Sequence, residues 1–165
     1  MIFRHTLTTI LRSSTRSFSS TPDRPIRWGI LSAGKIASDY AKAIQVAQGS
    51  EVRLFLSCAI VTSHSLTHFL SFSQALAVAA RSEQKAQAFA KEHGIPQFYG
   101  SYDDLLADPE IDVVYVGSVA DQHNKLATMS LLAGKPTVVE KPLTLSYDEA
   151  SKLVQLAKKQ DLFLM

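Results

Sequence analysis

The chain has 165 residues, of which 46% are hydrophobic and 19% charged, so its composition is that of one globular domain and not of a disordered chain. A single cysteine, Cys58, excludes a disulfide framework and a cysteine-built zinc site. The formal net charge is +2, but Arg4, Arg12 and Arg16 all precede the first acidic residue, Asp23. The remaining 14 basic and 15 acidic residues nearly cancel, so the body of the chain has no net positive charge to attract nucleic acid.

Residues 1–21 differ in composition from the rest of the chain. They contain three arginines, no acidic residue and many serines and threonines, which is typical of a mitochondrial presequence. Arg16 stands shortly before a run of small residues, as at a matrix-peptidase cleavage site, and the apolar run is too short for a secretory signal. The sequence favours a mitochondrial location, with a disordered tail on a cytoplasmic protein as the alternative.

From residue 24 onward, short apolar runs alternate with segments of helical period. Strands are predicted at 27–31, 76–80, 98–99, 113–116, 137–139 and 162–165. Helices are predicted at 35–48, 82–93, 101–108, 121–133 and 146–160, with Ser82, Ser101 and Ser146 at their starts and Gly94 and Gly134 at their ends. This alternation predicts an α/β fold, a doubly wound parallel sheet of the Rossmann type over residues 24–165.

Residues 54–80 contain no Asp, Glu, Lys or Arg. A membrane span is excluded because serine, threonine and histidine interrupt the apolar residues, and no helical or strand period runs through the segment. We interpret residues 52–74 as an atypical insert, a translated in-frame intron, which the genomic codons at its two ends would test. His64 and His68 are four apart, like metal ligands on a helix, but without a third ligand nearby no metal site is predicted.

The first predicted strand leads directly into a helix through a turn of small residues. Ser32, Gly34 and Ala37 fall on the three positions of the dinucleotide-binding pattern G-x-G-x-x-G, with serine in place of the first glycine. Gly34 would let the backbone approach a pyrophosphate at the helix N-terminus, and Ala37 would allow close packing of helix on strand. A tight turn without a ligand is the alternative interpretation.

The second predicted strand ends at Arg81 and Ser82, where NAD-binding proteins place an acidic residue about 20 positions after the glycines. Arg81 lies 47 positions after Gly34, and 24 if the 23 residues 52–74 are left out. A guanidinium at this place suits a 2′-phosphate, which favours NADP over NAD, and an ordinary surface arginine is the alternative. Lys141, in the loop after the fifth predicted strand, is a candidate to bind the reacting hydroxyl and assist loss of its proton.

Six motifs in this order resemble the Gfo/Idh/MocA oxidoreductase family, and most of all its branch of dimeric dihydrodiol dehydrogenases and NADP-dependent D-xylose 1-dehydrogenases. The motifs are WGILSAGKIASD (28–39), AVAARS (77–82), YGSY (99–102), VYVG (114–117), HNK (123–125) and EKP (140–142). The resemblance implies hydride transfer between NADP and a sugar or cyclic diol. It places cofactor contacts at Ser32, Ala33, Gly34, Lys35, Ile36, Arg81, Ser82, Val119, His123, Glu140 and Lys141, and makes Lys141 catalytic.

The chain also departs from the family pattern. The family implies a second α/β domain that carries substrate and homodimer contacts, and we expect this domain to begin just past Met165. The loop 117–120 lacks the usual Thr-Pro sequence near the nicotinamide. The resemblance therefore predicts that the 165-residue chain binds NADP weakly or not at all and turns over no substrate. The alternative function is a non-catalytic NADP-binding module or pseudoenzyme, with no nucleic-acid or membrane partner.

Overall fold

The computed structural model describes residues 24–49 and 73–165. The predicted presequence at 1–21 and nearly all of the predicted insert at 52–74, including His64 and His68, lie outside the described residues.

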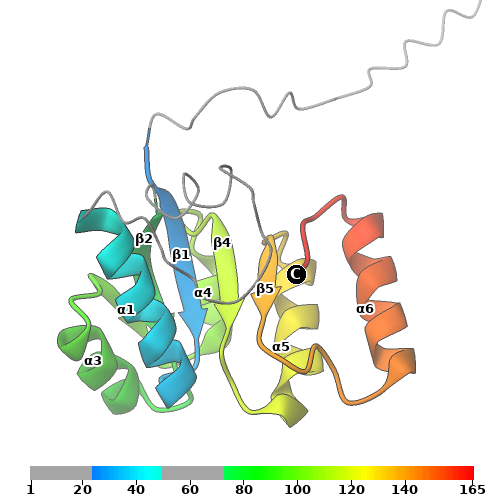
Figure 1. The fold of residues 1–165 in the computed structure, drawn as a ribbon, viewed down its shortest axis with the longest axis horizontal. Coiled ribbons are helices and arrows are strands. Elements are labelled where there is room, and N and C mark those ends of the chain that lie inside the picture. The colour runs from blue at the N-terminus through cyan, green and yellow to red at the C-terminus, as the bar shows by residue number, and fades with distance from the viewer. Residues whose placement is uncertain (1–23, 50–72) are drawn as a thin grey trace, which may run out of the picture.

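Five parallel strands form a sheet in the order β3-β2-β1-β4-β5 (Figure 1). The strands are β1 (Ile26–Leu31), β2 (Ser73–Ala79), β3 (Gln97–Tyr99), β4 (Val113–Val116) and β5 (Thr137–Val139). The chain moves outward from β1 to β3 and then crosses back to the other side of β1 with β4. The strand order therefore reverses between β1 and β4, which is the switch point at which open α/β sheets bind ligands. This topology confirms the predicted doubly wound fold.

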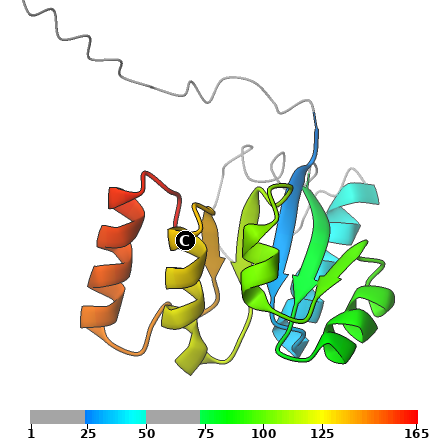
Figure 2. The same cartoon turned by 180° about the vertical axis from the view of Figure 1, so that it is seen from behind.

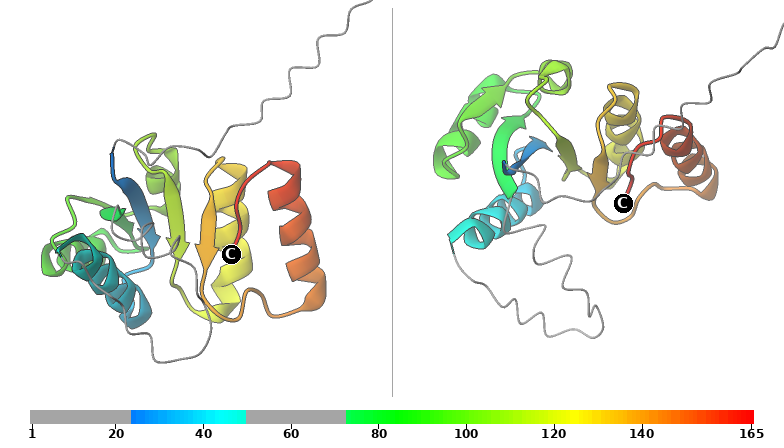
Figure 3. Two further views of the ribbon diagram at one scale, coloured as in Figure 1. Left: turned by 45° about the horizontal axis from the view of Figure 1, so that its top comes forward. Right: turned by 90° about the horizontal axis from the view of Figure 1, so that it is seen from above.

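Helices cover both faces of the sheet (Figures 2 and 3). They are α1 (Lys35–Gly49), α3 (Glu83–Glu92), α4 (Tyr102–Ala107), α5 (Ala120–Leu132) and α6 (Tyr147–Lys159). Ile30 packs with Ile44 of α1, and its neighbour Leu31 packs in a second cluster with Leu105 of α4, because successive strand side chains point to opposite faces. Among the described residues, no helix combines the length and the apolarity needed to cross a membrane.

Residues 162–165 were predicted to start a further strand, and they extend the sheet beyond β5. Leu164 forms a parallel bridge to Thr137. Three backbone hydrogen bonds support it: Thr137 N to Phe163 O at 2.9 Å, Met165 N to Thr137 O at 3.1 Å and Val139 N to Met165 O at 2.7 Å. α6, which precedes this segment, packs against α5 through Leu153 and Leu131.

β2 begins earlier than the sequence predicts. Its first residues, Ser73 and Gln74, pair with Ile26 and Arg27 of β1, and Ser73 is fully buried. The sequence predicts these two residues to be the end of the insert, but pairing with the central strand determines their conformation whatever their own strand propensity. The pairing register of β1 with β2 shifts between Trp28 and Gly29, so this strand pair contains a bulge or similar irregularity.

The predicted helix ends are confirmed in detail. Each N-cap serine accepts a backbone hydrogen bond: Ser82 from Lys85 N at 3.5 Å, Ser101 from Asp103 N at 3.1 Å and Ser146 from Glu149 N at 3.3 Å. Gly94 and Gly134, predicted as terminators, have positive φ angles of +59° and +76°.

Candidate dinucleotide-binding site

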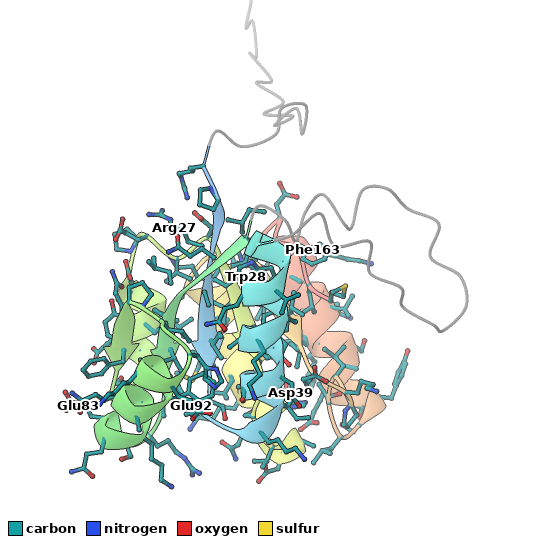
Figure 4. The ribbon with its side chains drawn as sticks, turned by 60° about the vertical axis from the view of Figure 1, so that its left-hand side comes forward. Arg27, Trp28, Asp39, Glu83, Glu92 and Phe163 are labelled. Carbon is teal, nitrogen blue, oxygen red and sulfur yellow. The ribbon has the colours of Figure 1, made fainter. Side chains whose placement is uncertain are left out.

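The loops after β1, β2, β4 and β5 meet at the carboxyl edge of the sheet, the lower edge in Figure 1. In Figure 4, Asp39 and Glu83 lie toward this edge, and Arg27 lies at the opposite one. Backbone hydrogen bonds tie three of these loops to neighbouring strands: Ser32 N to Ala79 O at 2.9 Å, Gly117 N to Leu31 O at 3.2 Å and Glu140 N to Val116 O at 3.1 Å. The sequence-predicted site residues are therefore brought to one edge, as the parallel topology requires.

The turn between β1 and α1 has a residue with positive φ at the first position of the dinucleotide pattern. Ser32 has a φ of +103°, in the region that glycine adopts without strain and other residues rarely enter. Ser32 stands where the pattern has its first glycine, so the backbone keeps the glycine conformation although the side chain has changed. The departure from the pattern at this position is therefore in the side chain and not in the turn.

Neither the backbone conformation nor the packing of the described residues requires a glycine at position 34. Its φ lies outside the left-handed region, and a Cβ atom there would lie 3.5 Å from Ser32 Oγ and 3.9 Å from Gly117 O, which are ordinary contacts. The space that such a Cβ would fill is the place where a pyrophosphate approaches the backbone in this type of turn. The first turn of α1 contains no acidic residue, so its free N–H groups and positive dipole end remain available to an anion. These residues fit a dinucleotide.

Gly117, at the end of β4, is glycine for a reason of packing. A Cβ atom there would lie 2.7 Å from Tyr115 Cε1 and 3.4 Å from Ala37 Cβ. Ala37, the third fingerprint position, is fully buried, so the close approach of α1 to the sheet depends on small residues from both elements. Next to them, Ile36 and Val119 are exposed, with 49% and 64% of their surface accessible. They add apolar surface at the edge where the resemblance places the dinucleotide.

Arg81 is exposed at the carboxyl end of β2, immediately before Ser82, the N-cap of α3. Arg81 therefore belongs to the loop and not to the first turn of the helix, where the acidic residue is Glu83. Within residues 24–49 and 73–165, the Arg81 guanidinium has no ion-pair partner. No charged side chain among these described residues therefore competes with an anion for Arg81.

Lys141 is exposed in a loop whose neighbouring residues are held in place. The Glu140 carboxylate accepts a hydrogen bond from Tyr115 Oη at 2.7 Å and another from Lys141 N at 3.2 Å. On the other side, the carbonyl oxygen of Pro142 lies 2.7 Å from Nδ1 of His123, and the Lys141–Pro142 peptide bond is cis. Both of the lysine's neighbours are therefore fixed by the fold.

His123 is almost completely buried, and both of its ring nitrogens face the protein. Nδ1 lies 2.7 Å from Pro142 O, and Nε2 lies 3.0 Å from Ser118 O. The side chain thus joins the loop after β4 to the loop after β5. Its predicted contact with the nicotinamide stays a prediction, and the geometry shows no ring nitrogen left over for a ligand.

Tyr115 and Gly117 are not among the site residues that the sequence predicts. A tyrosine inside an otherwise aliphatic buried strand is a signal for Tyr115, because a buried hydroxyl nearly always has a hydrogen-bond partner. That the partner is Glu140, 25 residues away, follows only from the pairing of β4 with β5.

Comparison with known proteins agrees with this geometry. The profile of the Gfo/Idh/MocA family, described as "Oxidoreductase family, NAD-binding Rossmann fold", matches residues 26–165. The chain belongs to the Gfo/Idh/MocA oxidoreductase family. The trans-1,2-dihydrobenzene-1,2-diol dehydrogenase of Danio rerio is 37% identical over 140 residues, which are 85% of this chain and 36% of that protein. The chain thus spans about a third of the length of the curated family members it matches.

Solved structures show the same fold. Biliverdin reductase from Synechocystis sp. PCC 6803, crystallised with biliverdin and NADP+, is 29% identical with a TM-score of 0.64, and the match covers 85% of this chain and 37% of the reductase. An NAD binding oxidoreductase from Klebsiella pneumoniae has a TM-score of 0.71 at 23% identity over 86% of this chain and 33% of its own, which supports the fold alone.

Proposed function

We propose that this chain forms the NADP-binding part of an oxidoreductase that transfers a hydride between NADP and a CH–OH group of a sugar or cyclic diol. Arg81 carries the proposal. Its guanidinium lies where NAD-binding members of this fold place an acidic residue against the ribose 2′-hydroxyl. A free guanidinium binds a phosphate through two parallel hydrogen bonds, whereas an acid would repel it. The NADP+ bound to the Synechocystis reductase supports the same coenzyme.

The other residues divide the binding task. Ser32, Gly34 and the N-terminus of α1 would hold the pyrophosphate, and Ser82 would add a hydroxyl beside the 2′-phosphate. When bound, NADP+ supplies an acceptor for the hydride that leaves the CH–OH carbon. The hydroxyl group then has a proton to lose, and the amine of the exposed Lys141 would hold the hydroxyl oxygen and assist that loss.

The name of the curated relatives suggests trans-1,2-dihydrobenzene-1,2-diol as one substrate. D-xylose, oxidised to D-xylono-1,5-lactone, is the second substrate that we propose, from the resemblance to the D-xylose dehydrogenase branch. The residues described above bind the coenzyme, and the substrate contacts of the family belong to its second domain. Of the two outcomes that the resemblance implies for coenzyme binding, weak or none, we propose weak binding, without oxidation of either compound.

A coenzyme titration tests the proposal. The chain is titrated with NADPH and with NADH while the nicotinamide fluorescence is followed, and each substrate is then supplied with NADP+ and the appearance of NADPH is measured. We expect NADPH to bind at least about tenfold more tightly than NADH, since one phosphate–guanidinium contact is worth more than 1.4 kcal/mol. Equal affinity for the two coenzymes, or no binding of either, would contradict the proposal.

A further inference from the structure

The Glu140 carboxylate bridges a buried side chain and the backbone of the candidate catalytic residue. One oxygen accepts the hydrogen bond of Tyr115 Oη at 2.7 Å, and the other accepts that of Lys141 N at 3.2 Å. Hydrogen bonds to a charged acceptor are short and about twice as strong as neutral ones. Through Glu140, the two bonds connect Tyr115 of strand β4 to the backbone of Lys141.

The ring of Tyr115 has little freedom to move. It stacks on Tyr40 of α1 with a centroid distance of 3.7 Å and an interplanar angle of 2°. Tyr40 in turn meets Trp28 edge to face at 5.5 Å. The main chain at Gly117 leaves no room for a Cβ atom beside the ring, and only 2% of Tyr115 is exposed. The hydroxyl is consequently held at one place.

Burial of the Tyr115 phenol, and then its hydrogen bond to Glu140, raise the pKa of the hydroxyl well above its usual value. The hydroxyl thus stays protonated, and a hydrogen-bond donor, at neutral pH. Glu140 accepts both hydrogen bonds, one from Tyr115 in the core and one from Lys141 in the surface loop.

We propose that Tyr115 is a positioning residue, which acts through the Glu140 carboxylate to fix the backbone at Lys141 and so to direct the lysine amine into the nicotinamide end of the crevice. The inference rests on the proposed function, because it gives Lys141 a coenzyme to face. A bond that only stabilised the fold would affect all parts of the crevice alike. A bond that positions Lys141 affects the nicotinamide half and leaves the adenosine half, bound by Arg81 on the far side of β1, unchanged.

Two ligands separate these effects in the 165-residue chain. NADPH carries both halves of the coenzyme, and adenosine 2′,5′-bisphosphate carries only the half with the 2′-phosphate. For Tyr115→Phe we expect the affinity for NADPH to fall about five- to tenfold, the size of one ordinary hydrogen bond, and the affinity for the bisphosphate to stay within twofold. The emission of bound NADPH should also shift toward that of the free nucleotide.

Tyr99→Phe is the matched control. Tyr99 Oη also donates to a carboxylate, Asp108 Oδ2 at 3.0 Å, but it lies on the edge strand β3, which β2 and β1 separate from β4. The Tyr99 hydroxyl is less buried than that of Tyr115, so the control should lower the melting temperature by no more than Tyr115→Phe does, and it should leave the affinities for both ligands unchanged. If Tyr115→Phe does not fold, amide hydrogen exchange in the unaltered chain is the second readout: the Lys141 amide, which donates to Glu140 Oε2, should be protected, and free exchange there would overturn the positioning role.

Equal losses for both ligands in Tyr115→Phe, or no loss for either, would overturn the positioning role and leave the proposed function intact. Failure of the unaltered chain to bind NADPH would overturn the proposed function and this inference with it.

Discussion

Substitution of Gly34 by alanine should separate what the fold requires from what a bound coenzyme requires. The new methyl group would lie 3.5 Å from Ser32 Oγ and 3.9 Å from Gly117 O, without steric conflict, and the backbone there needs no left-handed conformation. We therefore expect the free energy of unfolding to change by less than about 0.5 kcal/mol, or to rise slightly because alanine restricts the unfolded chain. The same methyl group would occupy the space of the pyrophosphate, so we expect NADPH to bind at least about tenfold more weakly.

Gly117→Ala is the comparison variant, since it adds an identical methyl group in a loop at the same edge of the sheet. There the Cβ atom would lie 2.7 Å from Tyr115 Cε1 and 3.4 Å from Ala37 Cβ, so the packing of α1 on the sheet must adjust. Overpacking of this kind costs about 1–3 kcal/mol. Urea denaturation gives the stability of both variants, and fluorescence titration gives their coenzyme affinity. The reasoning is refuted if Gly34→Ala destabilises the protein as much as Gly117→Ala, or if it binds NADPH as the unaltered chain does.

Two further predictions concern stability. Ser32→Gly should raise the free energy of unfolding by up to about 1 kcal/mol, because relief of the strain at a φ of +103° outweighs the added freedom of the unfolded chain; a decrease in urea denaturation would count against the strained turn. Partial burial acts to raise the pKa of Asp112, but the hydrogen bonds from Arg24 and Arg27 outweigh it and lower the pKa from 3.8 to about 2. Because its pKa is lower in the folded state, the Asp112 carboxylate stabilises the protein above pH 3.8, by at most about 1 kcal/mol after solvent screening. This stabilisation is lost as the pH falls through about 2. Asp112→Asn should remove this part of the acid dependence of the melting temperature, and an unchanged pH profile would contradict it.

Much of the fold follows from local sequence signals. Ser82, Ser101 and Ser146 cap the helices that they are predicted to start, because the side-chain oxygen of an N-cap residue accepts a hydrogen bond from a free amide two or three residues later. Gly94 and Gly134 end helices with the positive φ angles that other residues avoid. Such signals depend on neighbours in the chain, so one sequence is sufficient to find them.

The features that the sequence does not predict depend on distant partners. β2 begins at Ser73 because β1 offers hydrogen bonds there, although no apolar run marks the place. The roles of Tyr115 and His123 depend on the loop at 140–142, which comes next to them only when β4 and β5 pair. The glycine-like turn at Ser32 is likewise a property of the strand–helix connection and not of the serine itself.

The central claim, that the guanidinium at the end of β2 selects the phosphorylated coenzyme, is tested most directly by reversing its charge. Arg81→Glu is titrated with NADPH and NADH beside Lys91→Glu, which makes the same change of charge at the far end of α3. We expect Arg81→Glu to lose the preference for NADPH, with its affinity for NADH kept or improved, and Lys91→Glu to retain the preference. An Arg81→Glu chain that still prefers NADPH to the same degree would contradict the account.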